Sequence, residues 1–364
     1  MQVTQTISPG SISYLADCDQ AVQVSSAAHR LDLPPRLELT TNSRPQSGEV
    51  VAVRVVDVNA GYPNIELTTG EEVHLNPGDI IVGALGIRKA LRGFSGKVPN
   101  RVEKGQSLYL LNKGGIIGEC TAFNRDLGWP SRVEYLGSVT RDGAILNLSD
   151  GALPVVEGSL PPVPLVMVFG TCMNAGKTTV CKQILERFTE KNYSVNAGKV
   201  AGVACLQDPL KMKRNGAREV LSFHDFGLPS SAHVTDLAPV ARSIIHCLAG
   251  SKPDFIVLEM GDGILGGYQV SSLFQDVELI NSQVCSILCA NDLMGVWGSL
   301  EWIEKRVGKI DDHPMLISGP VTDSAEGINY IEQNWNIPAA NAFDSPGKIC
   351  NFILKHLKPW LKLA

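Results

Sequence analysis

The sequence predicts an α/β fold with a doubly wound parallel sheet, preceded by a small and mostly antiparallel β-barrel or sandwich. Two observations predict this. Short β-rich segments separated by turn residues fill residues 49–152. From residue 165 onward, apolar segments of strand length alternate with helical stretches. The first pattern is typical of a small antiparallel domain, and the second of a parallel sheet covered by helices on both faces.

The composition limits the classes of function. The chain has 364 residues, of which 44% are hydrophobic and 19% charged, which is enough for two domains with apolar cores. Its net charge of −5 argues against general nucleic-acid binding. No apolar run approaches membrane-spanning length, and the N-terminus lacks a signal-peptide pattern. Nine cysteines without a C-x-x-C pair favour free thiols. We therefore expect a cytoplasmic protein without a membrane partner.

Four segments are expected along the chain. Residues 1–48 are weakly patterned and are expected to form an N-terminal arm laid on the next domain. Residues 49–152 are expected to form the β-barrel-like domain, with strands such as VVAVRVVDV and DIIVGALGI. Residues 153–164 are proline-rich and predict a semi-extended linker. Residues 165–364 are expected to form the α/β domain.

One loop of the β-domain is unusually basic. Residues 86–101 read GIRKALRGFSGKVPNR, with five cations, three glycines and Phe94, which is expected to be exposed. In an acidic protein, such a loop is a candidate site for a phosphate or a carboxylate. We expect Arg88, Lys89 and Arg92 to contact a small anionic substrate. The alternative is a solvated loop without a ligand.

The α/β domain shows five apolar strand candidates. They are Val166–Phe169, Ser194–Val200, Phe255–Leu258, Val284–Ala290 and Met315–Ser318, with helical stretches starting at Gly176, Ala238, Ser271, Leu293 and Ser324. A strand-like IPAANA and a helix from Pro346 close the chain, whereas residues 206–220 have no clear periodicity. Ligands of such sheets bind at the carboxyl ends of the strands. The candidate site residues are therefore those that follow each strand.

The first strand leads into a glycine-bounded loop, G-x-x-x-x-x-G-K-T, and then into an amphipathic helix. This strand–loop–helix unit predicts phosphate binding by backbone N–H groups and by the positive end of the helix. A lysine in this position neutralises phosphate charge, and the hydroxyl that follows it ligates Mg²⁺. The alternative is a chance strand–turn–helix. The predicted nucleotide-binding residues are Gly170, Thr171, Met173, Asn174, Ala175, Gly176, Lys177, Thr178, Thr179 and Asn291.

Acidic residues follow the strand Phe255–Leu258. An apolar strand that ends in a carboxylate is the Walker B arrangement, so Glu259 is predicted to be a Mg²⁺ ligand together with Thr178. Asp262 is predicted to act in catalysis, as a second ligand or as a base that accepts a substrate proton. The alternative is that Asp262 caps its glycine-rich turn.

The loop resembles that of dethiobiotin synthetase (G-T-D-x-x-x-G-K-T), a P-loop protein of the SIMIBI class. The matching residues are Gly170, Thr171, Gly176, Lys177 and Thr178, while Cys172 replaces the aspartate. The segment EMGDG from Glu259 resembles the Glu-Gly-Ala-Gly-Gly of that enzyme, and Lys199 stands where it has a lysine facing phosphate or substrate. The resemblance covers about the last two hundred residues. It implies ATP and Mg²⁺ as cofactors, and a Mg²⁺-binding aspartate for which Asp208 is the best candidate.

The leading hypothesis is an ATP- and Mg²⁺-dependent phosphoryl-transfer enzyme of the ligase or kinase type. It would activate a small carboxylate or amine, with Lys177, Lys199 and Asp262 as catalytic residues, and we expect a homodimer. The basic loop would cover the substrate. One alternative is a SIMIBI regulatory NTPase that acts as a switch or chaperone for a partner, and another is a nucleic-acid 5′-kinase. ATP is preferred by resemblance, since N-D-L-M from Asn291 differs from the guanine-reading N-K-x-D.

Overall fold

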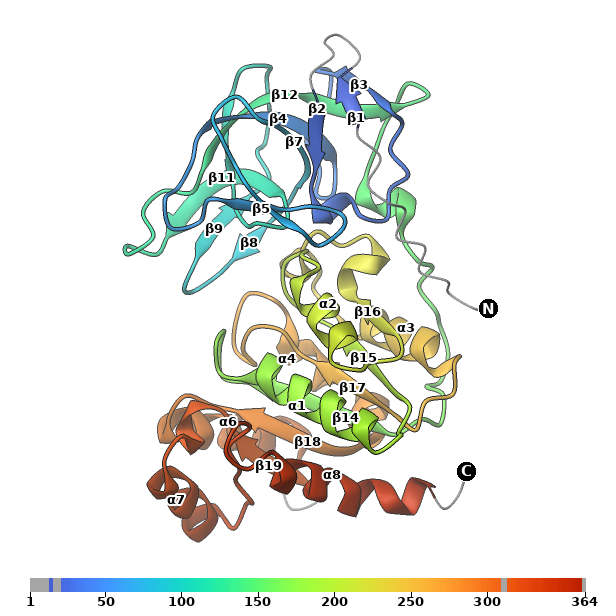
Figure 1. Cartoon of the computed structure of the whole chain (residues 1–364), viewed down its shortest axis with the longest axis vertical. Coiled ribbons are helices and arrows are strands. Elements are labelled where there is room, and N and C mark those ends of the chain that lie inside the picture. The colour runs from blue at the N-terminus through green and yellow to red at the C-terminus, as the bar shows by residue number, and fades with distance from the viewer. Residues whose placement is uncertain (1–12, 16–20, 309–312, 362–364) are drawn as a thin grey trace.

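The computed structural model describes residues 13–15, 21–308 and 313–361. Two units lie one above the other along the long axis of the molecule, with the β-domain at one end and the α/β domain at the other (Figure 1). Within the described ranges, no helix combines the length and apolar character that crossing a membrane requires.

The β-domain is built on one eleven-stranded sheet. Its strands are β1 (Ser13–Leu15), β2 (Ala21–Val24), β3 (Arg36–Thr40), β4 (Val50–Asp57), β7 (Ile80–Leu85), β8 (Arg88–Lys89), β9 (Phe94–Lys97), β10 (Ser107–Leu110), β11 (Ile116–Phe123), β12 (Arg132–Arg141) and β13 (Ala144–Ile145). A separate hairpin joins β5 (Asn64–Glu66) to β6 (Glu72–His74). Most pairs are antiparallel, while β1–β3, β2–β7 and β7–β11 are parallel.

The sheet closes on itself twice. Its order is β3-β1-β2-β7-β4-β12-β10-β11-β9-β8, and the additional pairs β3–β12 and β7–β11 complete two circuits that share β7, β4 and β12. Each circuit encloses its own apolar core, so the shared strands are buried on both faces. In β4, Val50 and Ala52 face one core, whereas Val51 and Val53 face the other. This explains why VVAVRVV is almost continuously apolar rather than alternating.

The predicted N-terminal arm needs correction. Its described residues include β1, β2 and β3, which pair with each other, with β7 and with β12 inside the sheet. The segment is therefore part of the barrel wall, because its backbone N–H and C=O groups form hydrogen bonds with neighbouring strands of the sheet. Prolines at 34 and 35 precede β3 instead of excluding strands. The other domain boundaries stay predictions.

The α/β domain has a six-stranded parallel sheet, as predicted. Its strands are β14 (Leu165–Gly170), β15 (Val195–Lys199), β16 (Val220–Ser222), β17 (Phe255–Glu259), β18 (Gln283–Cys289) and β19 (Met315–Ser318), in the order β16-β15-β17-β14-β18-β19. All five pairs are parallel. β16 lies where no strand was predicted, since three residues are too short to show a pattern. The strand-like IPAANA makes only an isolated bridge, Ile317 to Ala339.

Helices cover both faces of this sheet. One face packs against α1 (Lys177–Glu190), α2 (Gln207–Arg214) and α8 (Pro346–Leu361). The other packs against α3 (Ala238–Ala249), α4 (Val270–Leu273), α5 (Val277–Asn281), α6 (Leu293–Val307) and α7 (Ala325–Trp335). Short 3₁₀ turns lie at Ser26–Ala28, Leu148–Gly151, Phe223–Phe226, Ser231–His233 and Pro320–Thr322. α2 was not predicted, because only Met212 of its residues is buried.

The β-domain docks on the residues that follow β15. Asn112 donates from Nδ2 to the Ala204 carbonyl at 2.8 Å, and Glu66 Oε2 accepts from the Leu206 N–H at 2.6 Å. A Cβ on Gly114 would collide with the Ala204 carbonyl, so only glycine allows this approach. The interface thus combines polar side chains of the β-domain with backbone groups of the α/β domain, and these hydrogen bonds fix how the two domains dock.

Candidate functional site

The loop between β14 and α1 is shaped by its backbone. It begins after Gly170, where a Cβ would come within 2.6 Å of the Cys289 carbonyl. It ends at Gly176, whose φ of 96° is in the left-handed region, with Asn174 at 61°. α1 then starts at Lys177. These conformations turn the chain sharply from the strand into the helix. The strand, the loop and the helix N-terminus together have the arrangement that is typical of phosphate-binding loops.

Lys177 lies inside this loop. Only 6% of its surface is exposed, and Nζ donates to the Cys172 carbonyl at 2.7 Å. The ammonium is thereby held over the loop backbone, where phosphate oxygens bind in proteins of this fold. A neutral carbonyl is a weaker partner for an ammonium than a phosphate, so an incoming phosphate would displace it.

Thr178 and Glu259 form the oxygen pair suited to Mg²⁺. β17 runs beside β14 with Glu259 opposite Val168, and this register brings Oε1 within 2.8 Å of Thr178 Oγ1, which donates to it. The other oxygen, Glu259 Oε2, is buried without a partner among the described residues. Burial raises the pKa of Glu259, although Lys199 opposes the shift. A buried carboxylate oxygen beside a hydroxyl fits a hard divalent cation.

Lys199 and Asp208 form an ion pair across the same cavity. Burial alone would lower the pKa of Lys199, but the charges of Asp208 and Glu259 raise it above its ordinary value. Lys199 in turn lowers the pKa of Asp208. The predicted metal ligand Asp208 thus has a cation as its partner in this structure, and its metal role stays a prediction.

Asp262 has the opposite environment. It is 8% exposed, its φ is 64°, and neither carboxylate oxygen has a hydrogen-bond partner among the described residues. Burial raises its pKa, while the charge of Lys177 and the Gly263 amide oppose the shift. The loop is pressed against the phosphate loop, since a Cβ on Gly263 would collide with the Thr171 carbonyl. The Gly263 amide acts on this carboxylate, so the alternative role of Asp262 as a cap of its glycine-rich turn stays open beside the catalytic one.

These groups line one cavity of about 590 Å³ between the two domains. Of the predicted site residues, it is lined by Arg88, Met173, Asn174, Gly176, Lys177, Thr178, Thr179, Lys199, Asp208, Glu259 and Asp262. Gly170, Thr171 and Ala175 belong to the same loop but do not line the cavity. Asn291 donates from Nδ2 to Cys172 Sγ at 3.0 Å, so it supports the loop and does not line the cavity.

The lining of the cavity also contains residues that the sequence did not reveal. Tyr62, Asn112 and Lys113 reach it from the β-domain, and Cys205 and Tyr268 from the α/β domain. Tyr62 follows a loop with no motif, and Lys113 was visible only as part of a turn. Their function depends on the docking of the two domains, which no local pattern encodes.

The basic loop is a hairpin of β8 and β9 rather than an open coil. Phe94, expected to be exposed, is 1% exposed, and the Arg88 guanidinium lies 5.9 Å from its ring centroid. Arg88 lines the cavity, whereas Lys89 and Arg92 do not, and Arg92 is exposed. Arg88 and Lys89 differ in environment because consecutive strand residues point to opposite faces, whereas Arg92 lies in the turn between β8 and β9.

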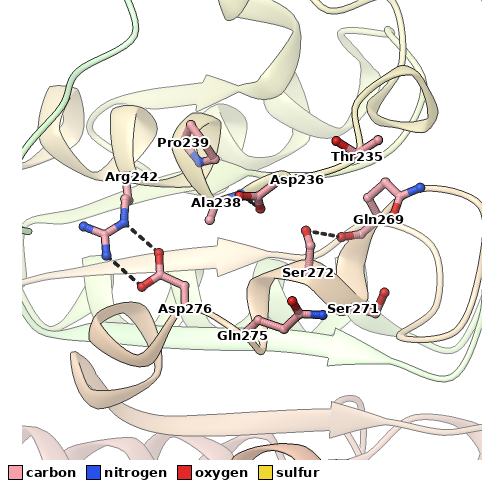
Figure 2. A pocket seen from close by; sticks show the side chains of 10 residues that line it. All are labelled: Thr235, Asp236, Ala238, Pro239, Arg242, Gln269, Ser271, Ser272, Gln275 and Asp276. Carbon is pink, nitrogen blue, oxygen red and sulfur yellow. Dashed lines mark hydrogen bonds and ion pairs between the residues drawn. The ribbon is translucent and has the colours of Figure 1, made fainter.

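A second cavity of about 530 Å³ lies between α3 and α4 (Figure 2). Its charged side chains already have partners. Arg242 bonds Asp276 in a bidentate pair at 2.6 and 2.7 Å, and Asp236 accepts from the Ala238 N–H at 2.9 Å. Without a free charge among the residues that line it, this cavity is a weaker candidate than the first.

Comparison with known proteins gives limited information. No protein-family model matches the chain, and no curated protein matches it either. Among solved structures, it is similar to the signal recognition particle receptor FtsY from Elizabethkingia anophelis, at 15% identity and a TM-score of 0.35, over 50% of this chain and 58% of that one. It is also similar to the signal recognition particle 54 kDa protein from Aeropyrum pernix K1 in complex with GDP, at 14% identity and a TM-score of 0.34, over 56% and 49% of the two chains.

A third similar structure is the cell division protein ftsY from Thermotoga maritima, with 21% identity and a TM-score of 0.35, over 58% of this chain and 74% of that one. The chain covers less than two thirds of the length of the first two structures. TM-scores this low carry no argument about function. The resemblance to dethiobiotin synthetase is not supported by these comparisons and stays a prediction.

Proposed function

We propose that the cavity between the two domains binds a Mg²⁺–nucleoside triphosphate and that the chain transfers its γ-phosphoryl group to a small acceptor. The observation that carries this proposal is the Thr178–Glu259 pair beside the buried Lys177. All three residues line a cavity to which the β-domain also contributes side chains. In this arrangement one cavity has room for the phosphates, for Mg²⁺ and for the acceptor.

Each floor residue has a distinct role. The loop amides and the N-terminus of α1 take the phosphates, and Lys177 transfers its ammonium from the Cys172 carbonyl to a phosphate oxygen. Thr178 and Glu259 would hold Mg²⁺, which neutralises charge on the phosphates when it is bound. Lys199, kept charged by Asp208, adds a second positive group. Fixed charges of this kind stabilise the charge of the transferring group without reorganisation.

The lining of the cavity suits transfer to an acceptor. The β-domain contributes Tyr62, Arg88 and Lys113 to its wall, so an acceptor can be held between the two domains. An acceptor bound there would displace water and favour transfer over hydrolysis. Asp262, with no internal partner, is placed to receive a proton from an acceptor.

For the nucleotide we propose ATP. In the guanine-reading pattern, a free aspartate follows the asparagine by three residues, and here that position is Met294, which is 69% exposed. The nearby Asp292 accepts from the Gly295 N–H at 2.7 Å as the cap of α6, so its carboxylate is engaged. Neither side chain supplies the free carboxylate that would recognise guanine.

A second candidate function is a regulatory NTPase. One observation favours it: the loop that follows β17 contacts the β-domain directly. The Lys89 N–H donates to the Tyr268 hydroxyl at 3.2 Å, and a Cβ on Gly267 would lie 2.5 Å from Lys89 Cδ. A conformational change of this loop on phosphate binding or release would therefore be transmitted to the β-domain, as a switch requires.

Phosphate release from Mg²⁺–ATP and Mg²⁺–GTP tests both functions. It is measured alone, with a panel of small acids and amines, and with RNA 5′ ends, and compared in Lys177→Ala and in Lys182→Ala, an exposed lysine on the same helix. Stimulation by one small compound, lost only in Lys177→Ala, supports phosphoryl transfer. Slow release that no small compound alters would instead support the switch, and activity that survives Lys177→Ala would refute both.

A further inference from the structure

The roof of the cavity contains a buried cation with an unused donor. Arg88 is 6% exposed, and its Nη1 donates to the Leu111 carbonyl, but Nε has no partner among the described residues. A buried guanidinium donor without an acceptor is costly. Since the side chain lines the cavity, the missing acceptor is expected to come from a ligand.

The floor contains the complementary group. Both Asp262 oxygens lack hydrogen-bond partners, although the residue is more than nine-tenths buried and lines the same cavity. It lies in the loop pressed against the phosphate loop, so a group bonded to Asp262 would be close to the transferring phosphoryl group. An acceptor-only carboxylate calls for an N–H or O–H donor.

The two groups are connected through one packed contact between the domains. The loop that carries Asp262 continues to Gly267 and Tyr268, which pack against Lys89, the residue next to Arg88 on β8. Arg88 also opposes the effect of burial on the pKa of Tyr268, as a nearby positive charge must. A ligand between Arg88 and Asp262 would therefore meet two preplaced groups, with little ordering needed on binding.

The charge balance of the cavity favours anions. Five cations line it, Arg88, Lys113, Lys177, Lys199 and Lys211, against the three carboxylates of Asp208, Glu259 and Asp262, in a chain whose net charge is −5. Lys177 and Lys199 lie on the phosphate side, while Arg88 and Lys113 come from the β-domain. Lys113 is already bonded to Glu72 at 2.5 Å, which leaves Arg88 as the roof group for a second anion.

We propose that Arg88 and Asp262 form an acceptor subsite for a small acid that also carries an N–H or O–H nucleophile, that is, an amino or hydroxy acid. Arg88 holds the acid group, since a guanidinium matches a carboxylate in geometry and charge. Asp262 accepts the hydrogen of the nucleophile. This inference rests on the proposed phosphoryl transfer and names its acceptor class.

The transfer step balances without a further reactant. The nucleophilic oxygen or nitrogen of the acid forms a bond to the γ-phosphorus, and the bond from that phosphorus to the β,γ-bridging oxygen breaks. The electron pair of the broken bond leaves with the nucleoside diphosphate. The proton of the nucleophile goes to Asp262, which later releases it to water.

A matched panel of compounds tests the subsite. It contains amino, hydroxy and plain acids of three to five carbons, such as alanine, lactate and propionate, with amines and alcohols that lack the acid. Binding is measured as the rise in Tm in the presence of Mg²⁺–ADP, and reaction as stimulated phosphate release from Mg²⁺–ATP. Plain acids are expected to bind without stimulating, amino or hydroxy acids to do both, and amines and alcohols to do neither.

Two variants locate the effect. Arg88→Met should weaken acid binding at least about tenfold, the loss expected for one charge-assisted pair, while Arg92→Met, an exposed neighbour on the same hairpin, should bind as the wild type does. Asp262→Asn is nearly isosteric and provides a second test if Arg88→Met does not fold. It should keep plain-acid binding and lower stimulated release roughly 10²-fold or more.

Three results would overturn the subsite: no acid of the panel binds, an amine without an acid group stimulates equally, or both variants behave as the wild type. Nucleotide binding is recorded in parallel with Lys177→Ala. If the wild type binds nucleotide and Lys177→Ala does not, a failed acid panel removes the acceptor subsite and leaves the nucleotide site standing. If neither protein binds nucleotide, the proposed function itself fails.

Discussion

The floor and the roof of the interdomain cavity are built in different ways. The floor is a contiguous loop, residues 170–179, joined by Glu259 from the neighbouring strand, and in the proposed function its backbone amides would bind the phosphates. The roof consists of single side chains, Tyr62, Arg88 and Lys113, from separate parts of the β-domain. A ligand site made of backbone tolerates side-chain change, whereas one made of side chains depends on domain docking.

The largest expected effect is on the floor. Lys177→Ala removes the buried ammonium that faces the phosphates, and turnover should fall by about 10²–10³-fold or more. The fold should persist, because the lysine contributes one bond to the loop carbonyl of Cys172. Steady-state phosphate release and circular dichroism check this. The matched change Lys182→Ala should leave both unchanged, and an equal loss there would contradict the assignment.

A variant at the domain interface should act through docking. Glu66→Ala removes the acceptor of the Leu206 N–H in the half-buried interface. Leaving a fully buried donor without an acceptor costs about 1–3 kcal/mol, so the free energy of unfolding should fall by about 1 kcal/mol. Because Leu206 precedes Asp208 on the cavity wall, the KM for nucleotide should also rise. Urea unfolding and steady-state kinetics test this, with Glu71→Ala on the exposed turn of the same hairpin as control. An unchanged unfolding free energy would show that this contact does not hold the domains together.

The docking interface should also be sensitive to acid. Burial lowers the pKa of His224 to about 3, and its Nε2 contacts the Ala27 carbonyl at 2.7 Å across the interface. The unfolded chain therefore binds a proton at this histidine below pH 6.5, while the folded chain does not, so stability is lost as the pH falls from 6.5 toward 3. As the pH falls from about 3.8 toward 2, Asp225 adds to the loss, because its partner His29 helps to hold its pKa at about 2, against the effect of burial.

Thermal unfolding at pH 7 and pH 5 measures this loss. His224→Gln should narrow the Tm difference between the two pH values, because glutamine does not titrate, and the exposed His233→Gln should not. A His224→Gln protein with the full wild-type pH dependence would assign the acid sensitivity to other groups.

The smallest expected effect is a gain in stability. Burial raises the pKa of Asp262, so the folded protein binds its proton more tightly than the unfolded chain. Stability should therefore fall as the pH rises from the ordinary pKa through the raised one. Asp262→Asn removes this loss and should stabilise the protein at neutral pH by about 1 kcal/mol, in the range for an unsatisfied buried group. A Tm that drops at pH 8 would mean that Asp262 has a stabilising partner.

The contrast between floor and roof also explains what the sequence revealed. The loop residues, Glu259 and the parallel sheet could be predicted, because a strand, a glycine-bounded turn and a helix lie in consecutive residues. The two β-circuits could not, since the strands were visible as apolar segments but the pairs that close the circuits, β3–β12 and β7–β11, join distant residues and leave no local pattern. Phe94 was wrongly predicted to be exposed, because its burial depends on tertiary contacts. Its ring packs edge-on against Tyr62 and lies near the Arg88 guanidinium, and neither contact can be inferred from the sequence.

Asp208 and Asp262 show the same limit at the level of single side chains. Asp262 was predicted from its position after a strand and Asp208 from the resemblance to dethiobiotin synthetase. Asp208 is paired with Lys199, whereas no hydrogen-bond partner of the Asp262 oxygens is found among the described residues. Their pKa values consequently shift in opposite directions. Sequence position brings a carboxylate to the sheet edge, but only the neighbouring elements decide whether it is neutralised or left available.

The most direct test is calorimetric titration of a non-hydrolysable ATP analogue into the wild type and Thr178→Val, each with and without Mg²⁺. The account predicts binding to the wild type that tightens with Mg²⁺, and binding to Thr178→Val that responds little to the metal, since the hydroxyl beside Glu259 is gone. Absent binding to the wild type, or an unchanged response to Mg²⁺ in Thr178→Val, would contradict the nucleotide site on which the proposed function depends.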